Sequence, residues 1–221
     1  MRIGLFGGTF NPIHHGHLRA AVEIQESFRL QKLYLIPAAL PPHKNVNKVI
    51  SATDRIEMTR LAIQDFPDFI LSDVELKRSG PSYTVDTVQA FQNHIEPGSD
   101  LFLIMGLDAF LEIDTWKSYK QLVRMLPIIV MTRPLQANDP TCTQWSGLTK
   151  LIHTRISNAY RLSEDKKCYR HDRCQPIHRQ AVSMLDISAT KIRQLVRQKR
   201  SIRFLVPQSV ENYIIKQGIY T

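Results

Sequence analysis

The sequence predicts an α/β protein with a parallel sheet and a small C-terminal helical part. Two patterns carry this prediction: short apolar runs alternate with segments of helical periodicity, and the first run ends in a double glycine before a helical segment. A strand, a tight turn and a crossover helix produce this order of signals. Because 221 residues fit one domain, we expect a single domain over 1–221, with a core at 1–186 and a helical part at 187–221.

Six short apolar runs predict the strands of the sheet. Pro37 ends the second run, since proline cannot continue a central strand, and Pro41 and Pro42 then predict an exposed loop. The predicted strands are 2–7, 33–37, 69–74, 101–105, 128–132 and 181–185.

Apolar residues three and four positions apart predict the helices. Ser51 with Asp54 forms a capping pattern, and Ser188 is a candidate N-cap. The predicted helices begin near 16 and after 51, and occupy 84–94, 116–125, 188–197 and 210–216. The stretch 133–180 has prolines and weak periodicity, so we expect loops there with room for one helix.

Composition excludes several classes of protein. Hydrophobic residues make up 43% and charged residues 22% of the chain, which is typical of globular rather than disordered or fibrous proteins. No apolar run approaches the roughly 20 residues that span a bilayer, and the N-terminus lacks the pattern of a signal peptide. Three cysteines suit a reducing compartment. We therefore expect a cytoplasmic protein with no membrane partner.

Positive charge gathers in one part of the chain. The net charge is +9, and residues 150–204 alone hold fourteen Lys and Arg against four acidic residues. Such a stretch suits a solvated surface or an anionic partner such as nucleic acid or a polyphosphate. No basic motif interleaved with aromatic residues accompanies it, so we expect no nucleic-acid partner and keep a nucleic-acid-binding module as the alternative from a different functional class.

The densest cluster of functional candidates is segment 7–17, which reads Gly-Gly-Thr-Phe-Asn-Pro-Ile-His-His-Gly-His. Glycines after a strand let the backbone approach a ligand closely. A helix beginning near Gly16 would direct its N–H groups at the same place, which suits an anion. His14 and His17 are three residues apart, so both imidazoles can face that ligand and the charge on transferring phosphates.

A second cluster follows the last predicted strand, in the sequence Ile-Ser-Ala-Thr-Lys-Ile-Arg at 187–193. Thr190 and Arg193 are neighbours on one helix face, and Ser188 caps the helix. A hydroxyl, a guanidinium and a helix N-terminus together can bind a polyphosphate.

These two clusters together resemble the signatures of the nucleotidyltransferase superfamily. More narrowly, the chain is similar to bacterial nicotinate-nucleotide adenylyltransferases, through short motifs in the expected order from Gly4 to Gly218. The motifs are Ile36-Pro37, Pro41-Pro42-His43-Lys44, Asp54-Arg55 with Met58, Glu75-Leu76-Lys77-Arg78, Ser82-Tyr83-Thr84, Gly106-Leu107-Asp108, Thr115-Trp116 and Thr132-Arg133-Pro134.

The resemblance implies a Rossmann-like open parallel sheet with helices on both faces and ATP at the carboxyl edge of the strands. It implies adenylyl transfer in NAD biosynthesis: the 5′-phosphate of nicotinate mononucleotide attacks the α-phosphorus of ATP in line, and pyrophosphate leaves. No protein nucleophile is needed, so positioning and charge neutralisation supply the catalysis. Mg²⁺ is expected as the cofactor, bridging phosphate oxygens and held mainly by substrate and water.

The resemblance also implies roles for individual residues. The catalytic residues would be His14, His17 and Arg193. ATP would be bound by Gly8, Thr9, Phe10, His14, His17, Gly106, Asp108, Arg133, Ser188, Thr190 and Arg193. Nicotinate mononucleotide would be bound by Lys44, Tyr83, Thr84, Asp108 and Trp116, with Trp116 stacked on the pyridine ring and the carboxylate at Tyr83 and Thr84. No protein metal site is implied, and a homo-oligomer is left open.

The chain departs from the family pattern at two places. Asn11 stands where the family often has aspartate, which places any metal or acid–base role there in doubt. Ala38 and Ala39 replace a segment that often holds an asparagine, so a substrate contact is missing.

Three alternatives within enzymes stay open: a preference for nicotinamide mononucleotide, dual specificity, or another reaction of the superfamily such as pantetheine-phosphate or cytidylyl transfer. Tyr83 and Thr84 favour the acid, since a desolvated carboxylate needs donors. Separately, Cys168, His171, Cys174 and His178 contain donor types that zinc prefers, but their spacing differs from the usual paired knuckles. We do not expect a structural metal there.

Overall fold

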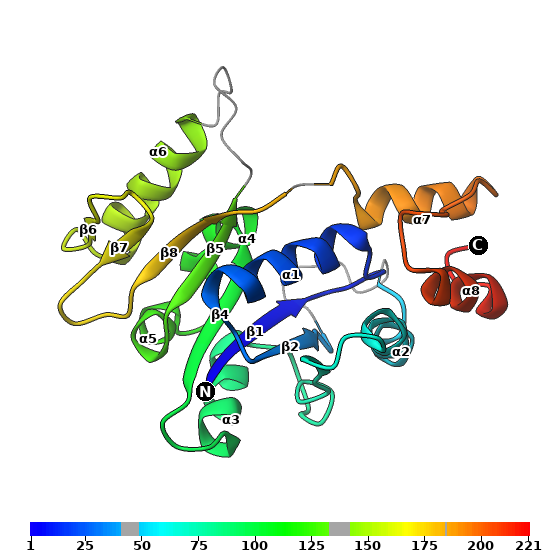
Figure 1. Cartoon of the computed structure of the whole chain (residues 1–221), viewed down its shortest axis with the longest axis horizontal. Helices are drawn as coiled ribbons and strands as arrows, with labels where there is room; N and C mark the ends of the chain where they lie inside the picture. The colour runs from blue at the N-terminus through cyan, green and yellow to red at the C-terminus, as the bar shows by residue number, and fades with distance from the viewer. Residues whose placement is uncertain (41–48, 133–141, 184) are drawn as a thin grey trace. The chain divides into compact units, whose positions relative to one another are not determined.

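The computed structural model of the chain describes residues 1–40, 49–132, 142–183 and 185–221 (Figure 1). It forms two compact units. The first comprises Met1–Leu5 and Tyr83–Ser183, and the second comprises Phe6–Ser82 and Met184–Thr221. Strand β1 (Arg2–Gly8) begins in the first unit and ends in the second. The single domain over 1–221 stays a prediction.

The first unit is built on a mostly parallel sheet. Its strand order is β1, β4 (Asp100–Gly106), β5 (Ile128–Thr132), β8 (Ile177–Ala181), β7 (Cys168–Arg170) and β6 (Arg161–Leu162). Strands β4, β5 and β8 are parallel, with Ile128 opposite both Leu103 and Ile177, whereas β7 and β6 continue antiparallel. Most residues of β4 and β5 are buried, as in a sheet covered on both faces.

Helices connect these strands. They are α3 (Thr84–His94), α4 (Leu107–Leu111), the 3₁₀ turn η2 (Ile113–Thr115), α5 (Tyr119–Met125), α6 (Cys142–Leu151) and the π-helical turn η3 (Ile152–Ile156). Helix α4 packs against β4 and β5, and α3 packs against α5. Because α4 follows β4 without an intervening loop, the carboxyl end of β4 is also a helix N-terminus.

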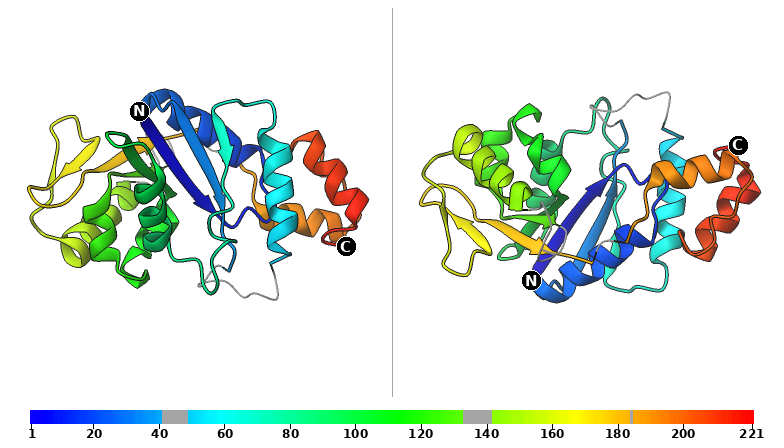
Figure 2. Two further views of the ribbon diagram at one scale, coloured as in Figure 1. Left: turned by 90° about the horizontal axis from the view of Figure 1, so that it is seen from below. Right: turned by 90° about the horizontal axis from the view of Figure 1, so that it is seen from above.

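The second unit contains the end of β1 with the parallel strands β2 (Lys32–Pro37) and β3 (Phe69–Leu71), in the order β3, β2, β1. Its helices are α1 (His15–Phe28), α2 (Ala52–Ile63), α7 (Ala189–Arg197) and α8 (Gln208–Gln217). Helices α2 and α8 lie side by side, as both views of Figure 2 show. The hydroxyl of Tyr213 on α8 donates to Oδ1 of Asp54 over 2.9 Å.

Local signals explain where the helices of this unit begin and end. Ser51 accepts from the Asp54 N–H at 3.0 Å, and Ser188 accepts from the Lys191 N–H at 3.2 Å, so both predicted caps are confirmed. Gly218, with φ 60°, ends α8 in the left-handed conformation that glycine adopts without strain.

The predicted fold class is confirmed: a mostly parallel sheet is flanked by helices. The strand predicted at 181–185 is wrong, because β8 occupies Ile177–Ala181 and pairs with β5 along its whole length. The sequence did not predict β8 because its residues are mostly polar, and only Ile177 in this strand is fully buried. The helix predicted at 116–125 begins only at Tyr119, and Trp116 is extended. The hairpin of β6 and β7 was not predicted.

Candidate functional site

The turn between β1 and α1 is shaped by Phe10. This residue has a φ of 46°, in the left-handed region, and its side chain is buried. Its ring lies edge-on to the rings of Phe6 and His17, with centroid separations of 5.7 and 5.2 Å. A Cβ at Gly8 would lie 2.8 Å from the Phe10 ring, so the second glycine leaves room for this ring over the backbone.

His14 and His17 form a stacked pair at the start of α1. Their ring centroids are 3.7 Å apart, and the planes differ by 29°. His14 is the N-cap, and its backbone N–H donates to Nδ1 of His17 over 3.3 Å. A Cβ at Gly16 would lie only 3.0 Å from Nδ1 of His14, so the glycine between the histidines leaves space for that ring. Since Nδ1 of His17 accepts, Nε2 carries the proton of the neutral ring and is a donor.

Burial keeps His14 uncharged at neutral pH. Loss of hydration, together with the positive charge of His15, lowers the pKa of His14 to about 4. Its Nδ1 is buried and has no hydrogen-bond partner among the described residues. Within the same part of the chain, the N–H groups of Phe10 and Gly16 have no partner either. The start of α1 therefore combines neutral polar groups with the positive end of the helix dipole, which suits phosphate oxygens.

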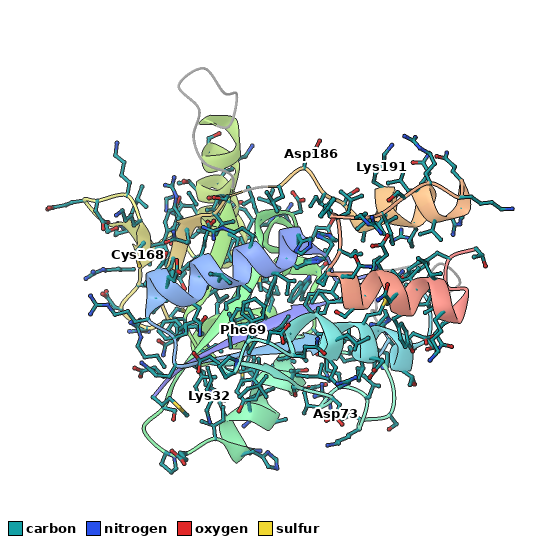
Figure 3. The ribbon with its side chains drawn as sticks, turned by 45° about the vertical axis from the view of Figure 1, so that its right-hand side comes forward. Lys32, Phe69, Asp73, Cys168, Asp186 and Lys191 are labelled. Atoms are coloured by element: carbon teal, nitrogen blue, oxygen red, sulfur yellow. The ribbon has the colours of Figure 1, made fainter. Side chains whose placement is uncertain are left out.

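Helix α7 reaches this turn through Arg193. Nη1 of Arg193 donates to the carbonyl oxygen of Asn11 over 2.8 Å, and Nη2 donates to Oγ1 of Thr190 over 3.1 Å. Ser188 caps the same helix, and Lys191 on its first turn is exposed (Figure 3). The structure thus brings the two clusters that the sequence singled out, 182 residues apart at their point of contact, to one place in the second unit.

Arg55 is a site residue that the sequence reasoning did not single out. Its side chain is 1% exposed, and its guanidinium donates to the carbonyl oxygens of Thr9 at 2.9 Å and Ala39 at 3.1 Å. Loss of hydration lowers the pKa of Arg55, while electrostatic interactions with Tyr220 and Glu75 act in the opposite direction. The Asp54-Arg55 motif was the available signal, but a buried arginine is visible only once the fold is known.

The side chain of Asn11 is held by the end of the chain. The Tyr220 hydroxyl donates to Oδ1 of Asn11 over 2.7 Å, and both residues are buried. Burial raises the pKa of Tyr220, so its hydroxyl keeps the proton that it donates. Asn11 therefore has a structural partner that a motif search cannot reveal, because the two residues are 209 positions apart.

In the first unit, Gly106 and Asp108 lie where β4 ends and α4 begins. Gly106 is the N-cap of α4, and Asp108 is exposed in its first turn. Strand β5 ends at the buried Thr132. Arg133, Lys44 and the loop at 41–44 lie outside the described residues, so their roles stay predictions.

Two of the predicted acceptor residues lie at the start of α3. Tyr83 is the N-cap of α3 and Thr84 its first residue, and both are half-buried. Trp116 is half-buried, and its neighbour Lys117 contacts this helix: the Lys117 Nζ lies 4.6 Å from the centroid of the Tyr83 ring and 3.0 Å from Oδ2 of Asp86. Lys117 was missed by the sequence reasoning, although it places a cation beside the expected carboxylate site.

Of the four possible zinc ligands between Cys168 and His178, His171 makes hydrogen bonds within the protein. Nδ1 of His171 accepts from the backbone N–H groups of Arg173 and Cys174, and its Nε2 lies 3.0 Å from Oγ of Ser157. In the described ranges no group of three or more His, Cys, Asp or Glu side chains could hold a metal ion.

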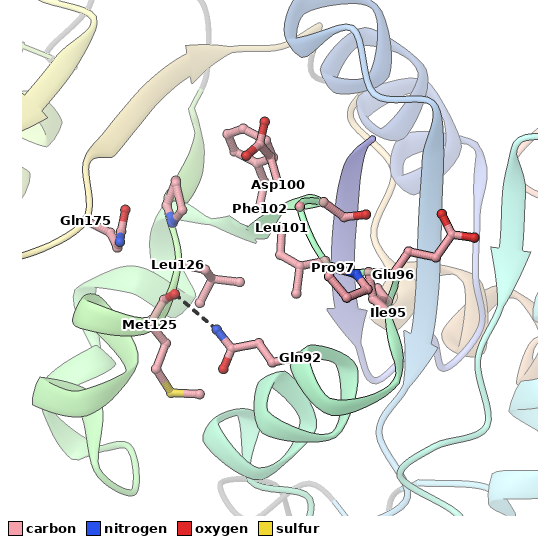
Figure 4. A pocket seen from close by; sticks show the side chains of 13 residues that line it. Gln92, Ile95, Glu96, Pro97, Asp100, Leu101, Phe102, Met125, Leu126 and Gln175 are labelled. Atoms are coloured by element: carbon pink, nitrogen blue, oxygen red, sulfur yellow. Dashed lines mark hydrogen bonds between the residues drawn. The ribbon is translucent and has the colours of Figure 1, made fainter.

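A cavity of about 340 Å³ lies elsewhere in the first unit, where β4 and β5 begin (Figure 4). The side chain of Gln92 on α3 forms part of its lining and donates to the carbonyl oxygen of Met125 over 3.2 Å. Gly106 and Thr132 lie at the opposite ends of these two strands, and none of the predicted site residues that the structure describes lines this cavity.

Comparisons with known proteins agree with this geometry. Residues 5–195 match the family model described as cytidylyltransferase-like. A probable nicotinate-nucleotide adenylyltransferase of Desulfatibacillum aliphaticivorans is 44% identical over the whole of both chains, and one of Geotalea daltonii is 42% identical over all of this chain and 98% of its own. The chain belongs to the nicotinate-nucleotide adenylyltransferase family.

Solved structures show the same fold at low sequence identity. The Plasmodium falciparum nicotinic acid mononucleotide adenylyltransferase complexed with NaAD has a TM-score of 0.70 at 17% identity, covering 99% of this chain and 97% of its own. A putative nicotinate-nucleotide adenylyltransferase of Vibrio parahaemolyticus has a TM-score of 0.60 at 16% identity, covering 99% of this chain and 94% of its own. The predictions of the family, of the Rossmann-like fold and of a nucleotidyltransferase are confirmed.

Among the described residues, no helix combines the length and the apolar character needed to cross a membrane.

The contact between Gly8 and Phe10 yields a stability prediction. Gly8→Ala should lower the free energy of unfolding by about 1–3 kcal/mol, because the added methyl group overlaps the buried ring. Gly7→Ala is the matched control, since nothing lies within 4 Å of a Cβ there, and it should change stability by less than about 0.5 kcal/mol. Urea unfolding of both variants checks this, and equal effects at the two glycines would contradict it.

The lowered pKa of His14 predicts a loss of stability in acid. The unfolded chain binds a proton near the ordinary pKa of 6.5 and the folded chain only near 4, so stability is full above pH 6.5 and falls as the pH drops toward 4. Between pH 7.5 and 5 this residue should cost roughly 2 kcal/mol. Urea unfolding of the parent chain and of His14→Gln at both pH values checks this, and the variant should lose roughly 2 kcal/mol less than the parent chain between pH 7.5 and 5. His178, whose pKa burial also lowers, contributes equally to both proteins, so its effect cancels in the difference.

Proposed function

We propose that this chain transfers the adenylyl group of ATP to nicotinate mononucleotide and releases pyrophosphate, a step of NAD biosynthesis. The observation that carries the proposal is the stacked histidine pair at the start of α1, of which His14 is neutral, joined through the turn to Arg193. It stands in a chain 44% identical to a relative named for this activity. No side chain needs to act as a nucleophile, because the substrate phosphate attacks directly.

His14, His17 and Arg193 act on the phosphates of ATP in this proposal. Their donors and the N–H groups of Phe10 and Gly16 neutralise charge that develops on the α-phosphate and on the leaving pyrophosphate. Ser188 and Thr190 bind phosphate oxygens from α7. These donors are imidazole, guanidinium, hydroxyl and backbone N–H groups, which fit a triphosphate that brings its own metal.

Mg²⁺ is the proposed cofactor, entering with ATP. When bound, it would neutralise part of the phosphate charge, and it would be held mainly by ATP and water rather than by side chains of this chain. No carboxylate near the turn is needed to hold it, in keeping with Asn11 in place of aspartate.

Nicotinate mononucleotide is the proposed acceptor, bound at the start of α3. The N–H groups at this helix end and the cation of Lys117 suit the nicotinate carboxylate, and Trp116 stacks on the pyridine ring. Asp108 binds ribose hydroxyls. Nicotinamide mononucleotide lacks the carboxylate, so it gains nothing from these groups. We place this reaction in the cytoplasm.

The direct test is pyrophosphate release from ATP and Mg²⁺ with each mononucleotide in parallel. Faster release with the acid supports the proposal, and equal rates would replace it with dual specificity. Release with neither acceptor, together with binding of nucleic acid that weakens steeply with salt, would favour the nucleic-acid alternative.

His17→Ala should reduce kcat by about 10²–10³-fold, the usual cost of removing a donor to transition-state charge. Circular dichroism and melting temperature should stay close to those of the parent chain. His94→Ala is the control, because His94 is exposed at the end of α3 and should leave the rate unchanged. Near-normal turnover of His17→Ala would place the phosphate site elsewhere.

Lys117→Met should raise KM for nicotinate mononucleotide by roughly tenfold, about the 1.4 kcal/mol of one exposed charge-assisted contact. KM for ATP should not change, and the low rate with nicotinamide mononucleotide should not fall further. Lys120→Met is the control, since Lys120 is exposed and its Nζ lies 5.9 Å from the centroid of the Tyr119 ring rather than on Tyr83 or Asp86. An equal effect of both variants would contradict a role for Lys117.

A further inference from the structure

We name the turn between β1 and α1, residues 9–14, the nucleotide turn. Three donors from distant parts of the second unit converge on its residues 9–11. Arg55 on α2 donates to the carbonyl oxygen of Thr9 at 2.9 Å. Arg193 on α7 and Tyr220 at the end of the chain donate to the main-chain and side-chain oxygens of Asn11, at 2.8 and 2.7 Å. We name Arg55, Arg193 and Tyr220 the carbonyl clamp.

The carbonyl clamp decides which way the remaining donor of the turn faces. In a planar trans peptide the N–H points opposite to the preceding carbonyl group. Because the Thr9 carbonyl group is directed at Arg55, the Phe10 N–H is directed away from that guanidinium, and it has no partner among the described residues. Asn11 is followed by Pro12, which has no N–H.

Tyr220 takes part in the carbonyl clamp although its backbone conformation is unfavourable. Its φ is 68°, a left-handed conformation that costs roughly 1 kcal/mol in a residue other than glycine. Gly218 turns the chain back after α8, and the Ile219 N–H donates to the carbonyl oxygen of Ile214 over 3.0 Å. The ring of Tyr220 is thereby buried, and its hydroxyl is placed on Asn11.

We propose that Tyr220 is a positioning residue for adenylyl transfer, which acts through Asn11 to hold the turn with its Phe10 N–H toward the phosphates of ATP. The inference rests on the proposed function, because it assigns a role in binding ATP and its transition state. Tyr220 does not touch the substrates. It fixes Asn11, which follows Phe10 and precedes His14, the two residues of this turn proposed to contact ATP, and the segment after α8 thereby supports the nucleotide site.

Tyr220→Phe tests this, with Tyr213→Phe as the matched control. Each variant loses one hydroxyl that donates to a side-chain oxygen, on Asn11 at 2.7 Å and on Asp54 at 2.9 Å, but only the first oxygen belongs to the turn. Tyr220→Phe should lower kcat by about tenfold and weaken ATP–Mg²⁺ binding in calorimetry, with KM for nicotinate mononucleotide unchanged. Tyr213→Phe should stay within about twofold in both.

A double-mutant cycle separates positioning from general destabilisation. Asn11→Leu keeps the size of the side chain and removes the acceptor, so it should reproduce the loss seen in Tyr220→Phe. The double variant should be no slower than the slower single variant, because the two residues act through one hydrogen bond. Additive losses, or equal kinetics of the two tyrosine variants despite normal melting temperatures, would overturn the inference while leaving the function of the active parent chain intact.

Calorimetry with ATP and Mg²⁺ keeps the test independent of the acceptor. If the parent chain binds ATP but releases no pyrophosphate with nicotinate mononucleotide, the proposed function fails, and weaker ATP binding of Tyr220→Phe alone still supports the positioning role. A parent chain that binds no ATP would overturn both.

Discussion

The nucleotide turn depends on guanidinium groups that bind its carbonyl oxygens. Between β1 and α1 the chain leaves the regular ladder of the sheet before the helix can pair its main chain, and the segment is nevertheless buried. Buried carbonyl groups need donors, and here Arg55 and Arg193 supply them at 2.9 and 2.8 Å. A guanidinium suits this task because its five donors spread in one plane. Helices α2 and α7 are thereby coupled to the same turn.

The second constraint is the removal of water from His14. Two charged imidazoles could not stack at 3.7 Å without strong repulsion, and burial resolves this by keeping His14 neutral. A neutral imidazole can still donate a hydrogen bond to an anion, without the energetic penalty of a buried charge. Positive charge at the turn then comes from the guanidinium groups of Arg55 and Arg193 and from the helix end.

Much of this arrangement was predictable because it depends on local spacing. Gly8 and Gly16 stand beside the rings that need their space, and the histidines face one another because they are three residues apart at a helix start. Prediction failed where pairing is non-local. Strand β8 is polar and is defined by its pairing with β5, and Arg55 and Tyr220 reach the turn only through the packing of α2 and of the chain end.

The sequence by itself determined the family, the alternation of strands and helices in the first 130 residues apart from the short α4, and the histidine, serine, threonine and arginine residues proposed for ATP, since each follows from a pattern of nearby residues. Only the tertiary structure decided that Arg193 and Tyr220 meet at Asn11, that Arg55 binds the turn, and that Lys117 lies beside Tyr83. The physical reason is that a hydrogen bond acts over about 3 Å, whereas the chain brings its partners together from up to 209 positions away.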